Sequence, residues 1–89
     1  MERKHRRMIE GQVCLFSLPR GLRKARVTHA IEDGLEASAC GRVLGSGTSL
    51  FDDGTIIVEI ASSDTRAADD VVSEVCRKLR CRDYEVIWD

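Results

Sequence analysis

The stretch "GRVLGSGTSLFDDGTIIVEIASS", residues 41–63, decides the fold, because its glycines allow either a phosphate-binding loop or a chain reversal between strands. A phosphate loop leads directly into a helix, and a P-loop also carries Gly-Lys-Ser/Thr. Here Asp53-Gly54, a strong hairpin signal, and a β-branched run follow the glycines instead. The stretch therefore predicts an edge strand over 41–47, a hairpin turn, and a central strand over 55–61.

The residues outside this hairpin predict two helices and two further strands. Apolar residues recur at helical spacing in two segments, at Val27, Ala30, Ile31, Gly34 and Leu35, and again at Ala68, Val71, Val72, Val75 and Cys76. Apolar runs over 12–18 and 84–89 predict the first and last strands. The order β-α-β-β-α-β indicates a ferredoxin-like α+β fold, with a four-stranded antiparallel sheet in strand order 4-1-3-2 and both helices on one face.

Length and charge limit the possible functions. The 89 residues suit a single domain over 1–89, which begins with a basic segment over 1–10. No apolar run approaches the roughly 20 residues that span a bilayer, and the basic start lacks the apolar core of a secretory signal, so we expect a cytoplasmic protein. Residues 1–30 carry a net charge of +6 and residues 31–89 a net charge of −7, which either marks a basic contact surface or lets the two halves neutralise each other.

The cysteines and acidic residues give no sign of a metal or catalytic site. Cys14, Cys40, Cys76 and Cys81 lack the close spacing of zinc ligands, so we expect buried thiols, with Cys81 the most exposed and reactive. His29 is expected on the surface of the first helix, and no G-x-S-x-G nucleophile motif is present. We therefore expect a non-enzymatic protein without a cofactor or bound metal.

The face of the sheet that lacks helices is the preferred candidate site. Such a face is normally polar, yet alternation along the strands assigns apolar residues to it. We expect Phe16, Ile57 and Trp88 to form an interface with a second copy or another protein. The alternative is that the N-terminal segment, with Met8 and Ile9, folds over this face.

Two other binding sites stay open. "LPRGLRKARVTHAIEDGLE" resembles the Pro-Gly-Leu entry to the first helix of ACT-type regulatory domains, although Arg20 separates the proline from the glycine. This resemblance implies an amino-acid-type ligand framed by Leu18, Pro19, Arg20, Gly21 and Leu22. The basic cluster Arg20, Arg23, Lys24 and Arg26 predicts, as a third possibility, contacts to nucleic-acid phosphates. The third strand has none of the aromatic residues with which an RNA-recognition motif stacks bases.

Overall fold

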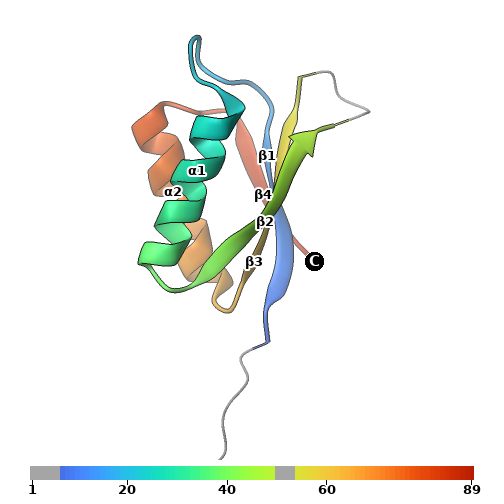
Figure 1. The fold of residues 1–89 in the computed structure, drawn as a ribbon, viewed down its shortest axis with the longest axis vertical. Helices are drawn as coiled ribbons and strands as arrows, with labels where there is room; N and C mark the ends of the chain where they lie inside the picture. Colours follow the sequence, from blue (N-terminus) through green and yellow to red (C-terminus); the bar gives the residue numbers. More distant parts are fainter. Residues whose placement is uncertain (1–6, 50–53) are drawn as a thin grey trace, which may run out of the picture.

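A computed structural model describes residues 7–49 and 54–89 of the chain. These residues form four strands and two helices along the sequence: β1 (Ile9–Leu15), α1 (Lys24–Ala37), β2 (Gly41–Thr48), β3 (Ile56–Ser62), α2 (Thr65–Leu79) and β4 (Tyr84–Trp88). Both helices lie against one side of the sheet (Figure 1). None of the described helices is long and apolar enough to cross a membrane.

The sheet has the strand order β2-β3-β1-β4, and each neighbouring pair is antiparallel. This is the predicted ferredoxin-like topology, so the fold prediction is confirmed. The strand ends differ most in β1, which was expected over 12–18. It begins at Ile9, because Ile9 and Glu10 extend the ladder to Ser62 and Ala61 of β3. It ends at Leu15, and the next amide, that of Phe16, donates a hydrogen bond to the Asp83 carbonyl at 2.9 Å.

The core lies between the sheet and the two helices. Alternate residues of the central strands supply its floor, and one stripe of each helix supplies its roof. Its fully buried aliphatic side chains are Val13, Leu15, Val27, Ile31, Leu35, Val58, Ile60 and Val72. Ser62 is buried beside them, where its hydroxyl donates to the Cys40 carbonyl at 2.6 Å and accepts from the Asp64 amide at 2.9 Å. This serine therefore ties the start of β2 to the start of α2.

Local chemistry explains where α2 begins and ends. Asp64 caps its first turn by accepting a hydrogen bond from the Ala67 amide at 3.1 Å. At the other end Arg80 adopts a left-handed conformation with φ of 62°, and the Cys81 amide donates to the Cys76 carbonyl at 2.8 Å. This turn brings the chain back toward the sheet and starts β4.

Gly34 sets the distance between the helices. Its place in the apolar stripe of α1 is compatible with close packing against either the sheet or the other helix. A Cβ at Gly34 would lie 2.7 Å from Val71 Cγ1, so the close approach is to α2. Gly34 lies on the side of α1 that faces α2. The apolar spacing in the sequence does not distinguish this side from the side that faces the sheet.

The glycine-rich stretch forms the expected edge strand. Among the described strands β2 pairs with β3 alone, and the register shifts at a bulge between Val43 and Gly45. Gly54 has a φ of 88°, the left-handed conformation that a glycine in a turn adopts readily. Asp52 and Asp53, the other residues of the predicted turn, lie outside the described residues.

Candidate functional site: the open face of the sheet

Trp88 lies on the opposite face from the one expected. Its ring packs against the core, and its Nε1 donates a hydrogen bond to Asp69 Oδ1 of α2 at 2.9 Å. The expected placement on the open face is therefore wrong. Strand alternation grouped Tyr84, Val86 and Trp88 correctly, but it could not tell which group faces the helices. Ile87, which is 45% exposed, takes the place of Trp88 on the open face.

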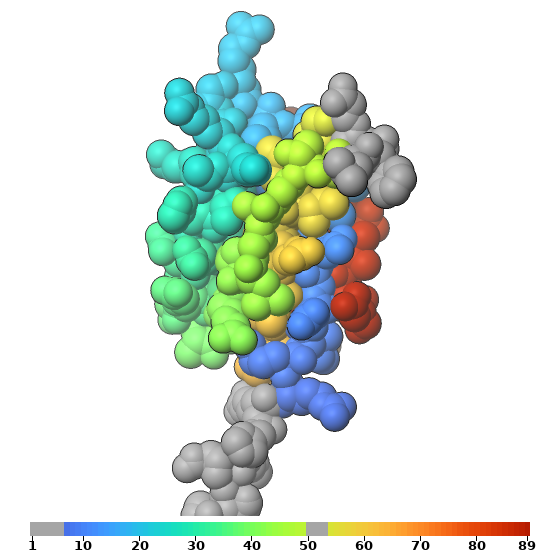
Figure 2. Space-filling view, turned by 45° about the vertical axis from the view of Figure 1, so that its right-hand side comes forward, coloured from blue at the N-terminus to red at the C-terminus, as the bar shows by residue number. Residues whose placement is uncertain are grey.

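The register of the sheet arranges the open face in rows across all four strands. One row runs Gly45, Glu59, Gln12 and Ile87, from the β2 edge to the β4 edge. The next row runs Gly47, Ile57, Cys14 and Glu85. Figure 2 shows the strands side by side in this order, with no helix in front of them. The face is thus a mixture of apolar and charged groups and is more polar than the sequence suggested.

The β2 edge of this face is hollow. Gly45 and Gly47 have no side chains, and an added Cβ at either would meet no atom within 4 Å. A depression of about 320 Å³ results, lined also by Ile57, Glu59 and Gln12. Leu44, which is 44% exposed, sits at the bulge and lines an adjoining small hollow with Gln12 and Glu59. Ile57 therefore gives the larger depression an apolar side, and Leu44 gives one to the smaller hollow.

The remaining predicted open-face residues are placed as follows. Phe16 is exposed and follows the last ladder pair of β1, so it stands at the rim of the face and not at its centre. Ile57 is half-buried in the middle rows, between Gly47 and Cys14. Ile9 belongs to β1 and shares the strand face of the buried Val13, so it lies on the helix side of the sheet and does not cover the open face; Met8, directly before it, is exposed. Most of the segment expected to cover the face, residues 1–6, lies outside the described residues.

The four cysteines are free and buried. The prediction that Cys81 is exposed is therefore wrong: its side chain is 3% exposed, because the turn after α2 folds it back into the core. Burial raises the pKa of the Cys81 thiol, and burial followed by the charge of Glu85 raises the pKa of Cys14. Burial likewise raises the pKa of Cys76 to about 12. A thiol held in its protonated form is a poor nucleophile, so these side chains belong to the core.

The turn over 18–22 has the shape expected for an entry to a helix. The Leu22 amide donates to the Pro19 carbonyl at 3.1 Å, and Gly21 has a φ of 86°. Leu18 and Leu22 pack against the core, while Arg20 is exposed. The apolar side chains of this turn are thus used in packing, and a ligand bound there would contact Arg20 and backbone groups.

A second concavity, of about 740 Å³, lies between α1 and α2 on the side away from the sheet. Small or aliphatic residues, among them Ala30, Gly34 and Val71, form its floor. Its rim carries charges of both signs, from Arg26 and Lys78 and from three acidic residues, Asp33, Asp70 and Glu74. This mixed rim gives no preference for a ligand of either charge.

Catalytic groups do not converge in the described part of the chain. His29 is exposed and lies 3.8 Å from Glu32 on the surface of α1. Residues 7–49 and 54–89 contain no group of three or more His, Cys, Asp or Glu side chains that could hold a metal ion. The adjacent acids Asp69 and Asp70 diverge, because Asp69 binds Trp88 whereas Asp70 lines the groove between the helices.

No protein-family model matches the chain, and neither the curated proteins nor the solved structures include a match.

Proposed function

We propose that this chain is a non-enzymatic binding module that pairs with a second copy of itself through the open face of its sheet. The observation that carries the proposal is that a projecting apolar side chain and a depression lie on the same row of this face. Ile87 projects at the β4 edge, and the depression over Gly45 lies at the β2 edge. A cytoplasmic location is part of the proposal, and the four free thiols support it.

A two-fold axis parallel to the strands makes these features complementary. If the axis runs between β3 and β1, the β2 edge of one copy faces the β4 edge of the other. Ile87 of each copy then meets the hollow over Gly45 of the other and contacts Leu44 beside it. Such a contact is isologous, and two sheets packed with their strands nearly aligned are a common arrangement.

The same axis also brings two pairs of polar side chains from the two copies opposite each other. Within the two rows, Glu59 faces Gln12 of the second copy, whose amide can donate to the carboxylate. A third row lies on the other side of the Gly45 row. In it Arg42 of β2 pairs with Ala61, Ala61 pairs with Glu10, and the Glu10 carbonyl accepts a hydrogen bond from the Asp89 amide. Arg42 therefore faces the acidic end of β4, at Asp89. Glu59 and Arg42 thus each gain a neighbour in the second copy that can pair with them, whereas Glu85 faces Gly47.

Sedimentation equilibrium of the full chain at micromolar concentrations tests this proposal. We expect a dimer of about twice the 9.9 kDa chain mass. Ile87→Lys should weaken the dimer about 30-fold or more, because it places a charge where Ile87 fills the hollow of the second copy.

Ile9→Lys is the matched control, because Ile9 is 41% exposed and lies on the other side of the sheet from the open-face residues of β1. We expect this variant to dimerise like the wild type. A wild-type chain that stays monomeric at high micromolar concentration would refute the proposal, and so would equal effects of the two lysine substitutions.

A further inference from the structure

One end of the molecule is strongly basic, because the fold joins two segments that are far apart in the sequence. The loop after β1 and the first turn of α1 lie at this end, together with the last turn of α2 and the loop that follows it (Figure 1). Its eight basic residues are Arg20, Arg23, Lys24, Arg26, Arg77, Lys78, Arg80 and Arg82. The segments 16–26 and 74–83 also contain two acidic residues, which leaves a net charge of +6.

Contacts between the segments show that they form one surface. Arg26 of α1 and Lys78 of α2 line the same groove between the helices. Leu22 and Leu79 pack against the same core cluster beneath them. The first four basic residues are close together in the sequence, whereas the other four join them only because the tertiary structure brings the end of α2 beside the start of α1.

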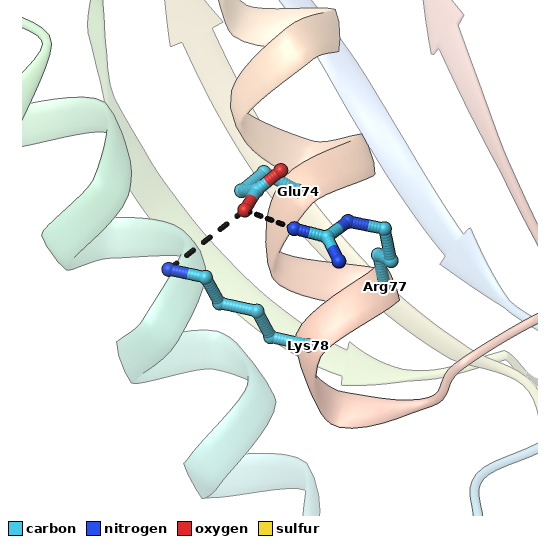
Figure 3. Close-up of polar contacts among 3 residues, drawn as sticks. All are labelled: Glu74, Arg77 and Lys78. Atoms are coloured by element: carbon cyan, nitrogen blue, oxygen red, sulfur yellow. Dashed lines mark hydrogen bonds and ion pairs between the residues drawn. The ribbon is translucent and has the colours of Figure 1, made fainter.

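Most of these charges lack an acidic partner. Glu74 pairs with Arg77 at 2.5 Å and with Lys78 at 3.8 Å (Figure 3). The other six basic side chains are exposed and form no ion pair with any residue that the structure describes. A cluster of unpaired like charges raises the free energy of the isolated protein, and an anionic partner relieves that repulsion.

The C-terminal turn of α2 gives part of this end a concave shape. A hollow of about 420 Å³ is lined by Arg77, Arg80 and Arg82, together with Cys76 and Cys81. The left-handed conformation of Arg80 turns the chain here, so that arginines on both sides of the turn border one space. Arginine presents a fork of N–H donors that matches phosphate oxygens.

An exposed aromatic residue lies at the same end of the molecule. Phe16 is 38% exposed, and its amide is bonded to the carbonyl of Asp83, the residue that follows Arg82. Single-stranded nucleic acids are bound by basic surfaces that follow the phosphates and by aromatic rings that stack on the bases. The combination of a flat ring and unpaired arginines favours this ligand over a polyanion that has no bases.

We infer that the basic end binds single-stranded nucleic acid, with Arg80, Arg82 and the start of α1 contacting phosphates and Phe16 stacking on a base. The site is at the end of the sheet and its loops, and it does not use the central strands. It lies beyond the rows of the proposed dimer contact, so either proposal can fail without the other.

Fluorescence anisotropy with a labelled oligothymidylate or oligouridylate of about 20 nucleotides tests the inference on the full chain. We expect binding at low salt, with log affinity falling against log salt at a slope of about −3, as four phosphate contacts would give for a single strand. Arg82→Glu should weaken binding more than tenfold. Arg66→Glu, at the opposite end of α2, is the matched control and should weaken it far less. Circular dichroism confirms that each variant is folded.

Phe16→Ala separates base recognition from charge. We expect it to weaken oligonucleotide binding about tenfold while leaving the binding of inorganic polyphosphate unchanged, because base stacking contributes only to the former. Vesicles of phosphatidylserine and phosphatidylcholine supply the membrane comparison, and we expect weaker binding to them than to the oligonucleotide.

Three results would overturn the inference. The first is no binding at low salt, and the second is an equal effect of Arg82→Glu and Arg66→Glu. The third is that polyphosphate or vesicles bind as tightly as the oligonucleotide, with an affinity that depends on Arg82 and does not change in Phe16→Ala. The last result would identify the end as a general polyanion surface or a lipid-binding surface.

Discussion

The indole Nε1 of Trp88 donates a hydrogen bond to Oδ1 of Asp69 at 2.9 Å, which ties the last strand to α2. Because side chains alternate along a strand, this contact places Trp88 on the helix side of the sheet and Ile87 on the open side. The ring also lies over Gly11, where an added Cβ would be 2.5 Å from Trp88 Cε3. The contact that Trp88 makes on the helix side of the sheet thus determines that Ile87 lies on the open face.

Removing this hydrogen bond should cost measurable stability. We expect Trp88→Phe to lower the free energy of unfolding by about 1–2 kcal/mol, since it removes a part-buried hydrogen bond to a carboxylate and some packed area. Tyr84→Phe is a matched control, because the Tyr84 hydroxyl bonds Ser73 at 3.0 Å in an exposed position. It should cost about 0.5 kcal/mol or less. Urea unfolding followed by circular dichroism compares the two, and equal losses would contradict the role given to Trp88.

Two glycines of the sheet should respond differently to alanine. Gly11→Ala forces the Trp88 ring and the backbone of β4 to move, and we expect a loss of about 1–3 kcal/mol. Gly45→Ala places a methyl group in open space and should leave stability nearly unchanged. Urea midpoints of the two variants test this difference. A tolerated alanine at Gly11 would show that the ring does not pack as described.

The buried thiols should make the fold less stable in alkaline solution. The pKa of Cys76 is raised from 9.0 to about 12 in the folded protein, so the unfolded chain loses this proton at a lower pH than the folded one. The stabilisation is therefore complete below about pH 9 and falls as the pH rises toward 12. For Cys76 the loss amounts to about 1.4 kcal/mol for each pH unit in that range.

Urea unfolding between pH 8 and 10.5 measures this effect. Cys76→Ala should start from a lower stability, because a fully buried side chain is shortened, and its stability should fall less steeply with pH than that of the wild type. Identical slopes for the two proteins would show that the Cys76 thiol does not contribute to the pH dependence.

The sequence predicted the topology because its signals are local. The spacing in α2 and the turn at Gly54 depend on residues close together in the chain, and the structure confirms both. The errors occurred where a distant contact decides the outcome. Trp88 faces inward, where Asp69 accepts a hydrogen bond from its indole N–H, and Cys81 is buried because a turn at Arg80 folds it back.

The candidate sites also combine features that local sequence predicts with features that depend on distant contacts. Ile57 was predicted on the open face from strand alternation alone, and it is half-buried in the central rows of that face. The pairing of Ile87 with a hollow over Gly45 could not be predicted, because it requires the register of all four strands. The basic end likewise requires knowing that the start of α1 and the end of α2 are neighbours.

The central claim, that two copies pair with Ile87 of one over Gly45 of the other, is tested most directly by cross-linking two variants that each carry one added cysteine. The native cysteines are buried, so cysteines introduced by Gly45→Cys and Ile87→Cys should react first. We expect a mixture of the two variants to form a disulfide-linked dimer under mild oxidation, and each variant alone to form far less. A mixture that cross-links no better than either variant alone would contradict the account.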